Sequence, residues 1–469
     1  MKKYLLIGCS ILFFACNDGD LQIETVDFDS IETVQSCDTV SVSTENVLFK
    51  INGDEALIVT LPSGLLKNEV STTELTIFVL YLFLEYAYMK HVYLDNAATT
   101  QVHPNVIAKM QDALGTYGNP SSTHSFGRTA KTAIESARKT IAKYINAQPS
   151  EIIFTSGGTE ADNMIIRCAV RDLGVKTIIT SRIEHHAVLH TVEELEQKAA
   201  IQLLYVDLDE YGNPDLAHLE TLLQKDDSKK LVSLMHVNNE IGNKIDLEEI
   251  TLLSKKYGAL VHSDTVQSLG HYNWDVKAFP IDFLAAAAHK FHGPKGIGFA
   301  FIRKNSGLSC MISGGSQERG LRAGTESFHN IVGLEEAFIY AYENLEAEKK
   351  YVEELKSYFI SQVKSTIPNA KFNGHSGDMD KSTYTLVNVC LPITEDKAML
   401  LLFNLDMKGI ACSKGSACQS GSDAGSHVLT QILSAEDMKK PSVRFSFSTY
   451  NSKEDIDYTI GVIKDIIEA

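Results

Sequence analysis

The chain has 469 residues and a mass of 51.7 kDa, which suits two or three domains. Its 44% of hydrophobic and 22% of charged residues exclude a collagen-like, disordered or multi-span membrane chain. Because the net charge is −17 and no arginine-rich segment occurs, we expect no direct nucleic-acid binding.

The first residues have the order of a secretion signal. Lys2 and Lys3 precede an apolar run over residues 4–15, and Cys16 follows it. This order resembles a bacterial lipoprotein signal peptide in which Cys16 takes the lipid. A short buried helix is the alternative.

Residues 1–88 differ in composition from the rest of the chain. They hold four lysines, no arginine and thirteen acidic residues. Residues 47–51 and 56–61 have the pattern of strands, and the apolar run 75–89 is shorter than the roughly 20 residues that span a bilayer. We interpret 1–88 as a lipoprotein-like extension, either a fused fragment or a gene-model join, with Met89 as the natural start of the catalytic part.

From residue 103 onward, helical and strand patterns alternate. Small and apolar residues at helical spacing predict helices over 123–146, 159–170, 188–200 and 328–359. Short apolar runs predict strands over 151–155, 177–181, 203–206, 231–236, 260–262, 283–286 and 298–302, most of them buried on both faces. The pattern predicts an α/β domain over 89–350 with a mostly parallel sheet. Strands at 385–390 and 442–446 among helices predict a smaller α+β domain over 351–469.

Polar residues gather where these strands end, which is where open α/β sheets bind ligands. Residues 154–160 join a strand to a helix through Gly157 and Gly158, so the helix start offers free N–H groups to an anion such as phosphate. A plain tight turn capped by Thr159 is an equal alternative. His185 and His186 follow the next strand, where they suit a metal ligand, a base, a ring-stacking group or a structural role.

Two further strand ends carry ionisable residues. Asp264 ends a buried strand, where a carboxylate is costly unless it meets a cation such as a protonated pyridine nitrogen. A helix N-cap is the competing interpretation. Lys290 follows a buried strand beside His289 and His292, and a desolvated lysine there has a lowered pKa and can bond covalently to a carbonyl.

The cysteines are sparse and lack the paired spacing of a zinc site or the density of a secreted scaffold. We expect free thiols in a reducing compartment for the six from Cys37 onward. Residues 412–422 form a loop of small residues that carries Cys412 and Cys418. Cys418 in such a loop has the pattern of a reactive thiol, and a regulatory Cys412–Cys418 disulfide is the alternative.

From residue 92 to the end, the chain resembles the cysteine desulfurases of the NifS/IscS type, in the class V group of fold-type I enzymes that use pyridoxal phosphate. The similarity covers about 380 residues, and residues 1–88 have no counterpart in it. The matching motifs are YLDNAATT (93–100), GNPSS (118–122), TSGGTE (155–160), HVNNEIG (236–242), HKFHGPKG (289–296) and GSAC (415–418).

The resemblance implies a role for each candidate residue. Lys290 would bond to pyridoxal 5′-phosphate, Asp264 would pair with the ring nitrogen and Gln267 would hold the ring oxygen. His185 would stack on the ring and transfer protons. Cys418 would be the nucleophile and a transient iron–sulfur ligand. The phosphate would be held by Gly158, Thr159, His289 and, from a second subunit of a homodimer, Thr325, and the substrate carboxylate by Asn239 and Arg444.

The implied reaction converts L-cysteine to L-alanine and leaves sulfur on Cys418 for an iron–sulfur scaffold, for tRNA thiolation or for both. Ala287 departs from the family, which often has a phosphate-binding serine there, and one lost hydrogen bond costs about 1 kcal/mol. Cys412 has no implied role. The alternatives are a class V aminotransferase or selenocysteine lyase, and a membrane-anchored binding lipoprotein with an idle enzyme-like domain. The catalytic part is expected in the cytoplasm.

Overall fold

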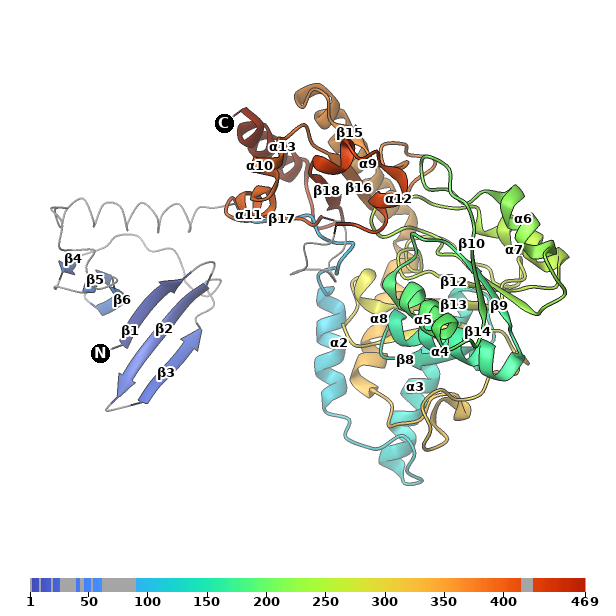
Figure 1. Cartoon of the computed structure of the whole chain (residues 1–469). Coiled ribbons are helices and arrows are strands. Elements are labelled where there is room, and N and C mark those ends of the chain that lie inside the picture. Colours follow the sequence, from blue (N-terminus) through green and yellow to red (C-terminus); the bar gives the residue numbers. More distant parts are fainter. Residues whose placement is uncertain are drawn as a thin grey trace. The chain divides into compact units, whose positions relative to one another are not determined.

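The computed structural model describes residues 90–414 and 425–468, with only the backbone at 395–396, and also the backbone of six strands between residues 2 and 60. It divides into two compact units, 1–90 and 91–469. Figure 1 shows both, and their placement relative to one another is not determined. Among the described residues, no helix has the length and apolar character needed to cross a membrane.

The first unit holds a six-stranded sheet with the order β3-β2-β1-β6-β5-β4. All neighbouring strands are antiparallel except β1 and β6. The strands predicted at 47–51 and 56–61 correspond to β5 and β6, and the apolar run 4–15 falls on β1 and β2. Cleavage at Cys16 and a start at Met89 concern processing of the chain and stay predictions. The bounds are β1 Lys2–Ile7, β2 Ser10–Asn17, β3 Asp20–Thr25, β4 Thr39–Val42, β5 Asn46–Ile51 and β6 Asp54–Thr60.

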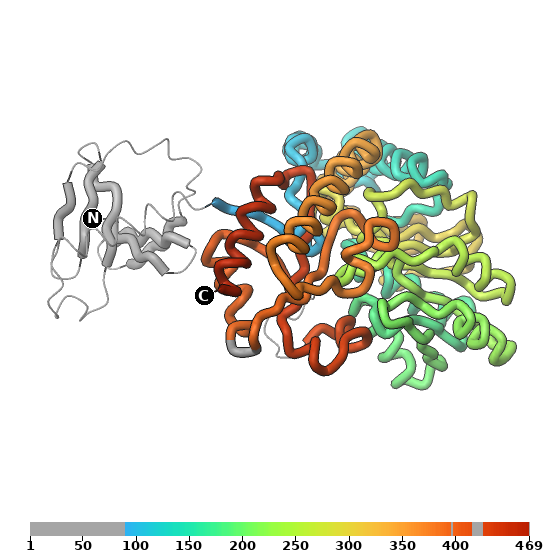
Figure 2. The backbone as a smooth tube through the Cα atoms, turned by 90° about the horizontal axis from the view of Figure 1, so that it is seen from above, coloured from blue at the N-terminus to red at the C-terminus, as the bar shows by residue number. Residues whose placement is uncertain are grey.

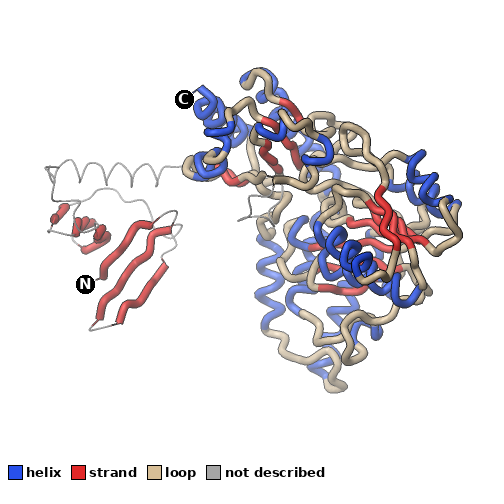
Figure 3. The backbone as a smooth tube through the Cα atoms, viewed as in Figure 1, coloured by secondary structure: helices blue, strands red, loops and turns tan. Residues whose placement is uncertain are grey.

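The second unit is built on a seven-stranded sheet with the order β10-β9-β11-β12-β13-β14-β8. Its first five strands run parallel, and β14 is antiparallel to both of its neighbours, so the predicted mostly parallel sheet is confirmed. Figure 3 shows these strands in red among the helices. The bounds are β8 Ile152–Thr155, β9 Thr177–Thr180, β10 Gln202–Tyr205, β11 Lys230–Ser233, β12 Leu260–Asp264, β13 Phe283–Ala287 and β14 Gly298–Ile302.

Helices cover both faces of this sheet because successive side chains of each strand point to opposite faces. Leu284 and Ala286 of β13 pack into one core with α2 (Pro104–Leu114), α3 (Ser125–Tyr144) and α8 (Phe328–Glu343). Phe283 and Ala285 pack into the other core with α4 (Gly158–Leu173) and α5 (His186–Gln197). Near β10, β11 and β12, α6 (Leu216–Gln224) and α7 (Leu247–Lys256) complete the cover.

The C-terminal part has its own sheet, β15-β16-β18, and its own core. A second small sheet pairs β17 with β7, so residues near 92 join the core of the C-terminal region. Figure 2 shows this part in orange and red beside the larger sheet region. The domain boundary at 350 stays a prediction. The bounds are β7 Val92–Tyr93, α9 Leu345–Thr366, β15 Lys371–Phe372, β16 Leu386–Cys390, α10 Glu395–Ala398, α11 Leu401–Asp406, β17 Ile410–Ala411, α12 Leu429–Ile432, β18 Ser442–Ser446 and α13 Lys453–Glu468.

Candidate active site

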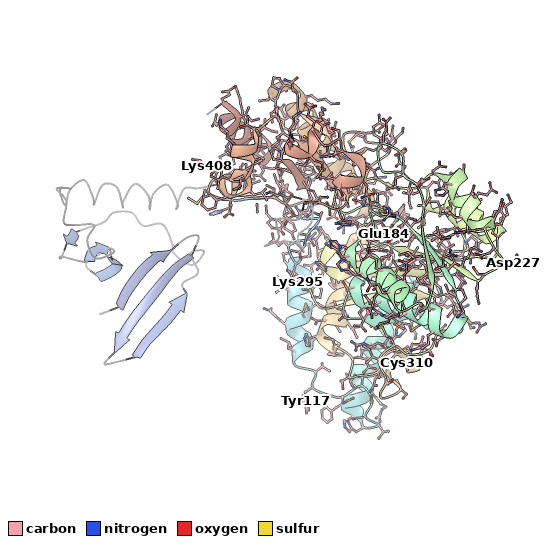
Figure 4. All side chains as sticks on the ribbon, viewed as in Figure 1. Tyr117, Glu184, Asp227, Lys295, Cys310 and Lys408 are labelled. Atoms are coloured by element: carbon pink, nitrogen blue, oxygen red, sulfur yellow. The ribbon has the colours of Figure 1, made fainter. Side chains whose placement is uncertain are left out.

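A cavity of about 240 Å³ opens where β8, β12 and β13 meet the chain segments that follow them. Figure 4 labels Glu184, whose neighbour His185 lines this cavity. Thr325 is exposed and does not line it, and Cys418 lies outside the described residues. Nine of the predicted site residues line the cavity: Gly158, Thr159, His185, Asn239, Asp264, Gln267, His289, Lys290 and Arg444.

Lys290 ends a 3₁₀ turn, Ala288–Lys290, that continues directly from β13. Its Nζ donates hydrogen bonds to the carbonyl oxygens of Ala97 at 2.5 Å and Ala98 at 2.8 Å. Ala287 supplies an apolar piece of the cavity wall. The amine is therefore held at the cavity by the segment 97–98, which belongs to the YLDNAATT motif.

Asp264 is the last residue of β12 and is buried. Its Oδ1 accepts a hydrogen bond from Val266 N at 2.9 Å, and the residue ends a strand rather than capping a described helix. Burial raises the pKa of Asp264 to about 6, and the positive charge of Lys290 acts in the opposite direction. A cation at this end of the cavity would therefore stabilise the carboxylate.

Two further acids, Asp162 and Glu184, are buried near Asp264, and neither was predicted from the sequence. Both carboxylate oxygens of Asp162 lack a hydrogen-bond partner, and its Oδ1 lies 3.2 Å from His262 Nε2. Burial raises the pKa of Asp162 well above its usual range and that of Glu184 to about 8, and repulsion from Asp264 adds to both shifts. Asp162 lies four residues after Gly158, so the two residues share one face of α4.

The first turn of α4 favours a negatively charged ligand. Gly157 is the N-cap of α4 and makes no side-chain capping bond, so the alternative in which Thr159 caps this helix is wrong. The free N–H groups of the first turn and the helix dipole favour an anion at Gly158 and Thr159. A Cβ on Gly158 would lie 2.4 Å from Val266 Cγ2, so only glycine fits without displacing a neighbour.

His185 caps α5, because its Nδ1 accepts a hydrogen bond from Ala187 N at 3.1 Å. That bond leaves Nε2 to carry the hydrogen of the neutral ring. Burial and the nearby Lys290 lower the pKa of His185 to about 4, so the ring is neutral near pH 7. His185 therefore has the structural role that was one of its predicted alternatives, and it also lines the cavity.

Arg444 is buried on β18 and holds a fixed orientation. Its Nη2 donates to Asp95 Oδ1 at 2.8 Å, and its Nη1 donates to the carbonyl oxygen of Asn239 at 2.7 Å. A buried, oriented guanidinium is suited to a carboxylate ligand.

Two other lining residues contact the YLDNAATT segment. Gln267 Nε2 donates to Ala97 O at 2.9 Å, and His289 Nδ1 lies 3.2 Å from Thr99 Oγ1.

The loop that carries Thr325 is tied to the start of α4. Arg322 Nε donates to Glu160 Oε1 at 2.8 Å. Further back, Glu318 adopts a left-handed conformation with φ 46° and is buried in a bidentate pair with Arg138, at 2.7 and 2.8 Å. These two ion pairs fix the loop between residues 318 and 325.

The described cysteines, Cys168, Cys310, Cys390 and Cys412, carry free thiols, and the alternative Cys412–Cys418 disulfide involves a residue outside the described part of the chain. Partial burial raises the pKa of Cys412 to about 12, so its thiol is protonated near neutral pH. Within residues 90–414 and 425–468, no three His, Cys, Asp or Glu side chains form a group that could hold a metal ion.

The cavity suits a ligand with a cationic ring and an anionic end. The buried acids Asp162 and Asp264 line it together with the Lys290 amine, and the N-terminus of α4 and His289 line it as well. Pyridoxal phosphate has this charge distribution when its ring nitrogen is protonated, and it also offers an aldehyde to the Lys290 amine. The residues present therefore fit this group.

Comparison with known proteins gives one family. Residues 92–459 match the family model described as aminotransferase class-V. The chain is 41% identical to cysteine desulfurase IscS of Dictyoglomus turgidum over 379 residues, covering 80% of this chain and 94% of that protein. It is 40% identical to the putative cysteine desulfurase IscS 1 of Bacillus subtilis over 381 residues, covering 80% and 98%.

Solved structures are similar over the same part of the chain. A NifS-like protein superposes with a TM-score of 0.73 at 34% identity, covering 81% of this chain and all of that one. SspA in complex with cysteine superposes with a TM-score of 0.67 at 30% identity, covering 77% of this chain and all of the other.

Proposed function

The chain belongs to the aminotransferase class-V family and, within it, to the cysteine desulfurases, and we propose that its cavity converts L-cysteine to L-alanine and transfers the sulfur to Cys418. The observation that carries the proposal is the meeting of Lys290, Asp264 and Arg444 at one cavity. It brings together an amine, a buried acid and a guanidinium from three separate parts of the chain.

Pyridoxal phosphate would be held by Lys290 through its aldehyde, by Asp264 at the ring nitrogen and by Gln267 at the ring oxygen. The N–H groups of Gly158 and Thr159, with His289, would hold the phosphate, and Thr325 of a second subunit would complete that site. When bound, the group supplies an electron-withdrawing ring that acidifies the substrate's Cα–H bond. Ala287 offers no side-chain hydrogen bond to the phosphate.

Arg444 and Asn239 bind the substrate carboxylate. The guanidinium already has a fixed fork, because Asp95 and the Asn239 carbonyl orient it. Holding the carboxylate would fix one end of the substrate in the cavity that Lys290 also lines, so its Cα–H bond could be presented to the amine.

Lys290 would take the substrate's Cα proton on its amine and return a proton when alanine forms. Its ammonium form is stabilised by the carbonyls of Ala97 and Ala98. His185 would stack on the ring, and its neutral imidazole, with the hydrogen on Nε2, would donate a hydrogen bond there.

Cys418 would attack the substrate sulfur as a thiolate, forming a sulfur–sulfur bond while the Cβ–S bond breaks and its electron pair stays on carbon. The outer sulfur of the persulfide would then pass to a sulfur acceptor, an iron–sulfur scaffold or a tRNA-thiolation protein, and Cys418 would also be a transient iron–sulfur ligand. Cys412 is not a substitute nucleophile, because burial keeps its thiol protonated.

The test is a Cys418→Ala variant of the full chain, with Cys412→Ala as its matched control. We expect Cys418→Ala to bind pyridoxal phosphate normally and to release no alanine from cysteine, while Cys412→Ala releases it at the parental rate. Turnover by Cys418→Ala at the parental rate would show that the nucleophile is elsewhere. Selenocysteine and a 2-oxo acid as substrates distinguish a selenocysteine lyase and an aminotransferase from a desulfurase.

A further inference from the structure

Lys290 is held through its backbone as well as through its amine. The carbonyl oxygen of His289 accepts hydrogen bonds from Thr100 N at 2.9 Å and from Thr100 Oγ1 at 3.0 Å. The carbonyl oxygen of Lys290 lies 3.0 Å from His271 Nε2. Two consecutive carbonyls beside the reactive lysine are therefore bonded by different segments of the chain.

The direction of the His271 bond follows from chemistry. A carbonyl oxygen only accepts, so His271 Nε2 carries the hydrogen and donates it to Lys290. Burial lowers the pKa of His271 to about 4, so the ring is neutral near pH 7 and its Nδ1 is an acceptor. Tyr384 Oη lies 3.2 Å from this Nδ1 and 3.2 Å from the His271 carbonyl, and its single hydrogen serves one or the other.

The turn before His271 is shaped for this approach. Gly270 has φ +86°, and a Cβ there would lie 2.7 Å from Phe291 Cβ. Glycine thus allows the segment 270–271 to lie against the residue that follows Lys290. Tyr384 comes from the chain just before β16, so the contact joins the C-terminal region to the lysine.

We propose that His271 is a positioning residue whose Nε2–H bond to the Lys290 carbonyl, supported by Tyr384, fixes the backbone from which the Lys290 amine reaches the cofactor. The inference rests on the proposed function, because it assigns Lys290 the covalent role. A fixed backbone leaves the amine only its side-chain rotations to search, which favours bond formation with the aldehyde.

Substitutions at position 271 differ in how far the new side chain reaches toward the Lys290 carbonyl. A cavity of about 30 Å³ borders both Lys290 and His271 and is large enough for a water molecule, which could replace the donor in a truncation to alanine. His271→Gln places an amide N–H near the position of Nε2 and keeps the bond to Lys290. His271→Asn reaches only as far as Nδ1 and loses it. Tyr384→Phe removes the supporting hydroxyl, and Tyr272→Phe is the matched control because its hydroxyl bonds Thr383 and the backbone of Tyr384 but not His271.

The experiment adds pyridoxal phosphate to each full-length apoprotein and follows the absorbance band of the lysine-bound cofactor, its rate of appearance and the pH at which it titrates. We expect His271→Asn to slow bond formation and to lower kcat by about fivefold, the value of one net hydrogen bond, with KM unchanged. His271→Gln and Tyr272→Phe should behave like the parent, and Tyr384→Phe should fall between.

Parental rates and titration for His271→Asn, or equal impairment of the Gln and Asn variants, would overturn the proposal. Should His271→Asn fail to fold, the comparison of Tyr384→Phe with Tyr272→Phe decides. Equal rates of cofactor bond formation and equal kcat in these two variants would contradict the proposal. Lys290→Ala separates this from the proposed function: if Lys290→Ala still gives the band, the covalent role itself is wrong, whatever the His271 variants do.

Discussion

Replacing Gly158 with alanine tests the anion cradle at the start of α4. The added Cβ would lie 2.4 Å from Val266 Cγ2, whereas an ordinary contact is about 3.4 Å or longer, so α4 or Val266 has to move by roughly 1 Å. Overpacking of this kind costs about 1–3 kcal/mol. If the start of α4 moves away from Val266, the N–H groups lose their alignment with the phosphate, and cofactor affinity should fall by about tenfold, which corresponds to roughly 1.4 kcal/mol.

The assay is a titration of apoprotein with pyridoxal phosphate, read by absorbance, beside thermal unfolding of the same samples. Val266→Ala removes the atom that clashes, so Gly158→Ala combined with Val266→Ala should regain most of the lost affinity. Gly461→Ala is the control, because no atom lies within 4 Å of its Cβ in α13. Parental affinity of Gly158→Ala, or no recovery in the double variant, would refute the reasoning.

Three other changes are expected to separate binding, protonation and stability. Arg444→Lys should raise KM for cysteine by about tenfold and leave the cofactor spectrum unchanged, because a lysine cannot keep the fork that bonds Asp95, and unchanged KM would contradict this. Burial raises the pKa of Glu184 to about 8 against about 4.3 unfolded, so its stabilising protonated form is complete below about pH 4 and is lost as the pH rises to 8. Urea titrations at pH 5 and 8 give the free energy of unfolding of the Glu184→Gln and parental apoproteins. The variant should be more stable relative to the parent at pH 8 than at pH 5, and an equal difference at both pH values would show that Glu184 does not titrate in this range. Arg138→Met should cost about 3 kcal/mol in the same measurement, because it leaves Glu318 buried and uncompensated, and a cost below about 1 kcal/mol would contradict it.

The central sheet was predictable because its strands are short apolar runs at regular spacing. The strands predicted at 298–302 and 442–446 coincide with β14 and β18. The helix predicted over 328–359 is two helices, α8 and α9, which meet at Asn344. Asn344 has φ −106° and ψ 4°, and no proline or glycine marks this break in the sequence. The strand predicted over 231–236 ends at Ser233, although Leu234 N and His236 N still bond the carbonyl oxygens of His262 and Asp264 of β12.

The candidate site was predictable where one local segment supplies the chemistry. Lys290, Asp264 and Gly158 each lie at or just after the end of a strand, so sheet geometry places them together. The contacts of His271 with Tyr384 join residues 113 apart in sequence, and no local pattern indicates them. Asp162 was missed because an acid in the second turn of a helix ordinarily indicates a solvated face, whereas here it is buried.

The covalent role of Lys290 is tested most directly by trapping the bond. The full-length protein, loaded with pyridoxal phosphate, is reduced with borohydride, digested and analysed by mass spectrometry. We predict a phosphopyridoxyl group on the peptide that contains Lys290 and on no other lysine. Cysteine added before the borohydride should prevent this labelling. A stable label on a different lysine, or no label on a protein that converts cysteine to alanine, would contradict the account.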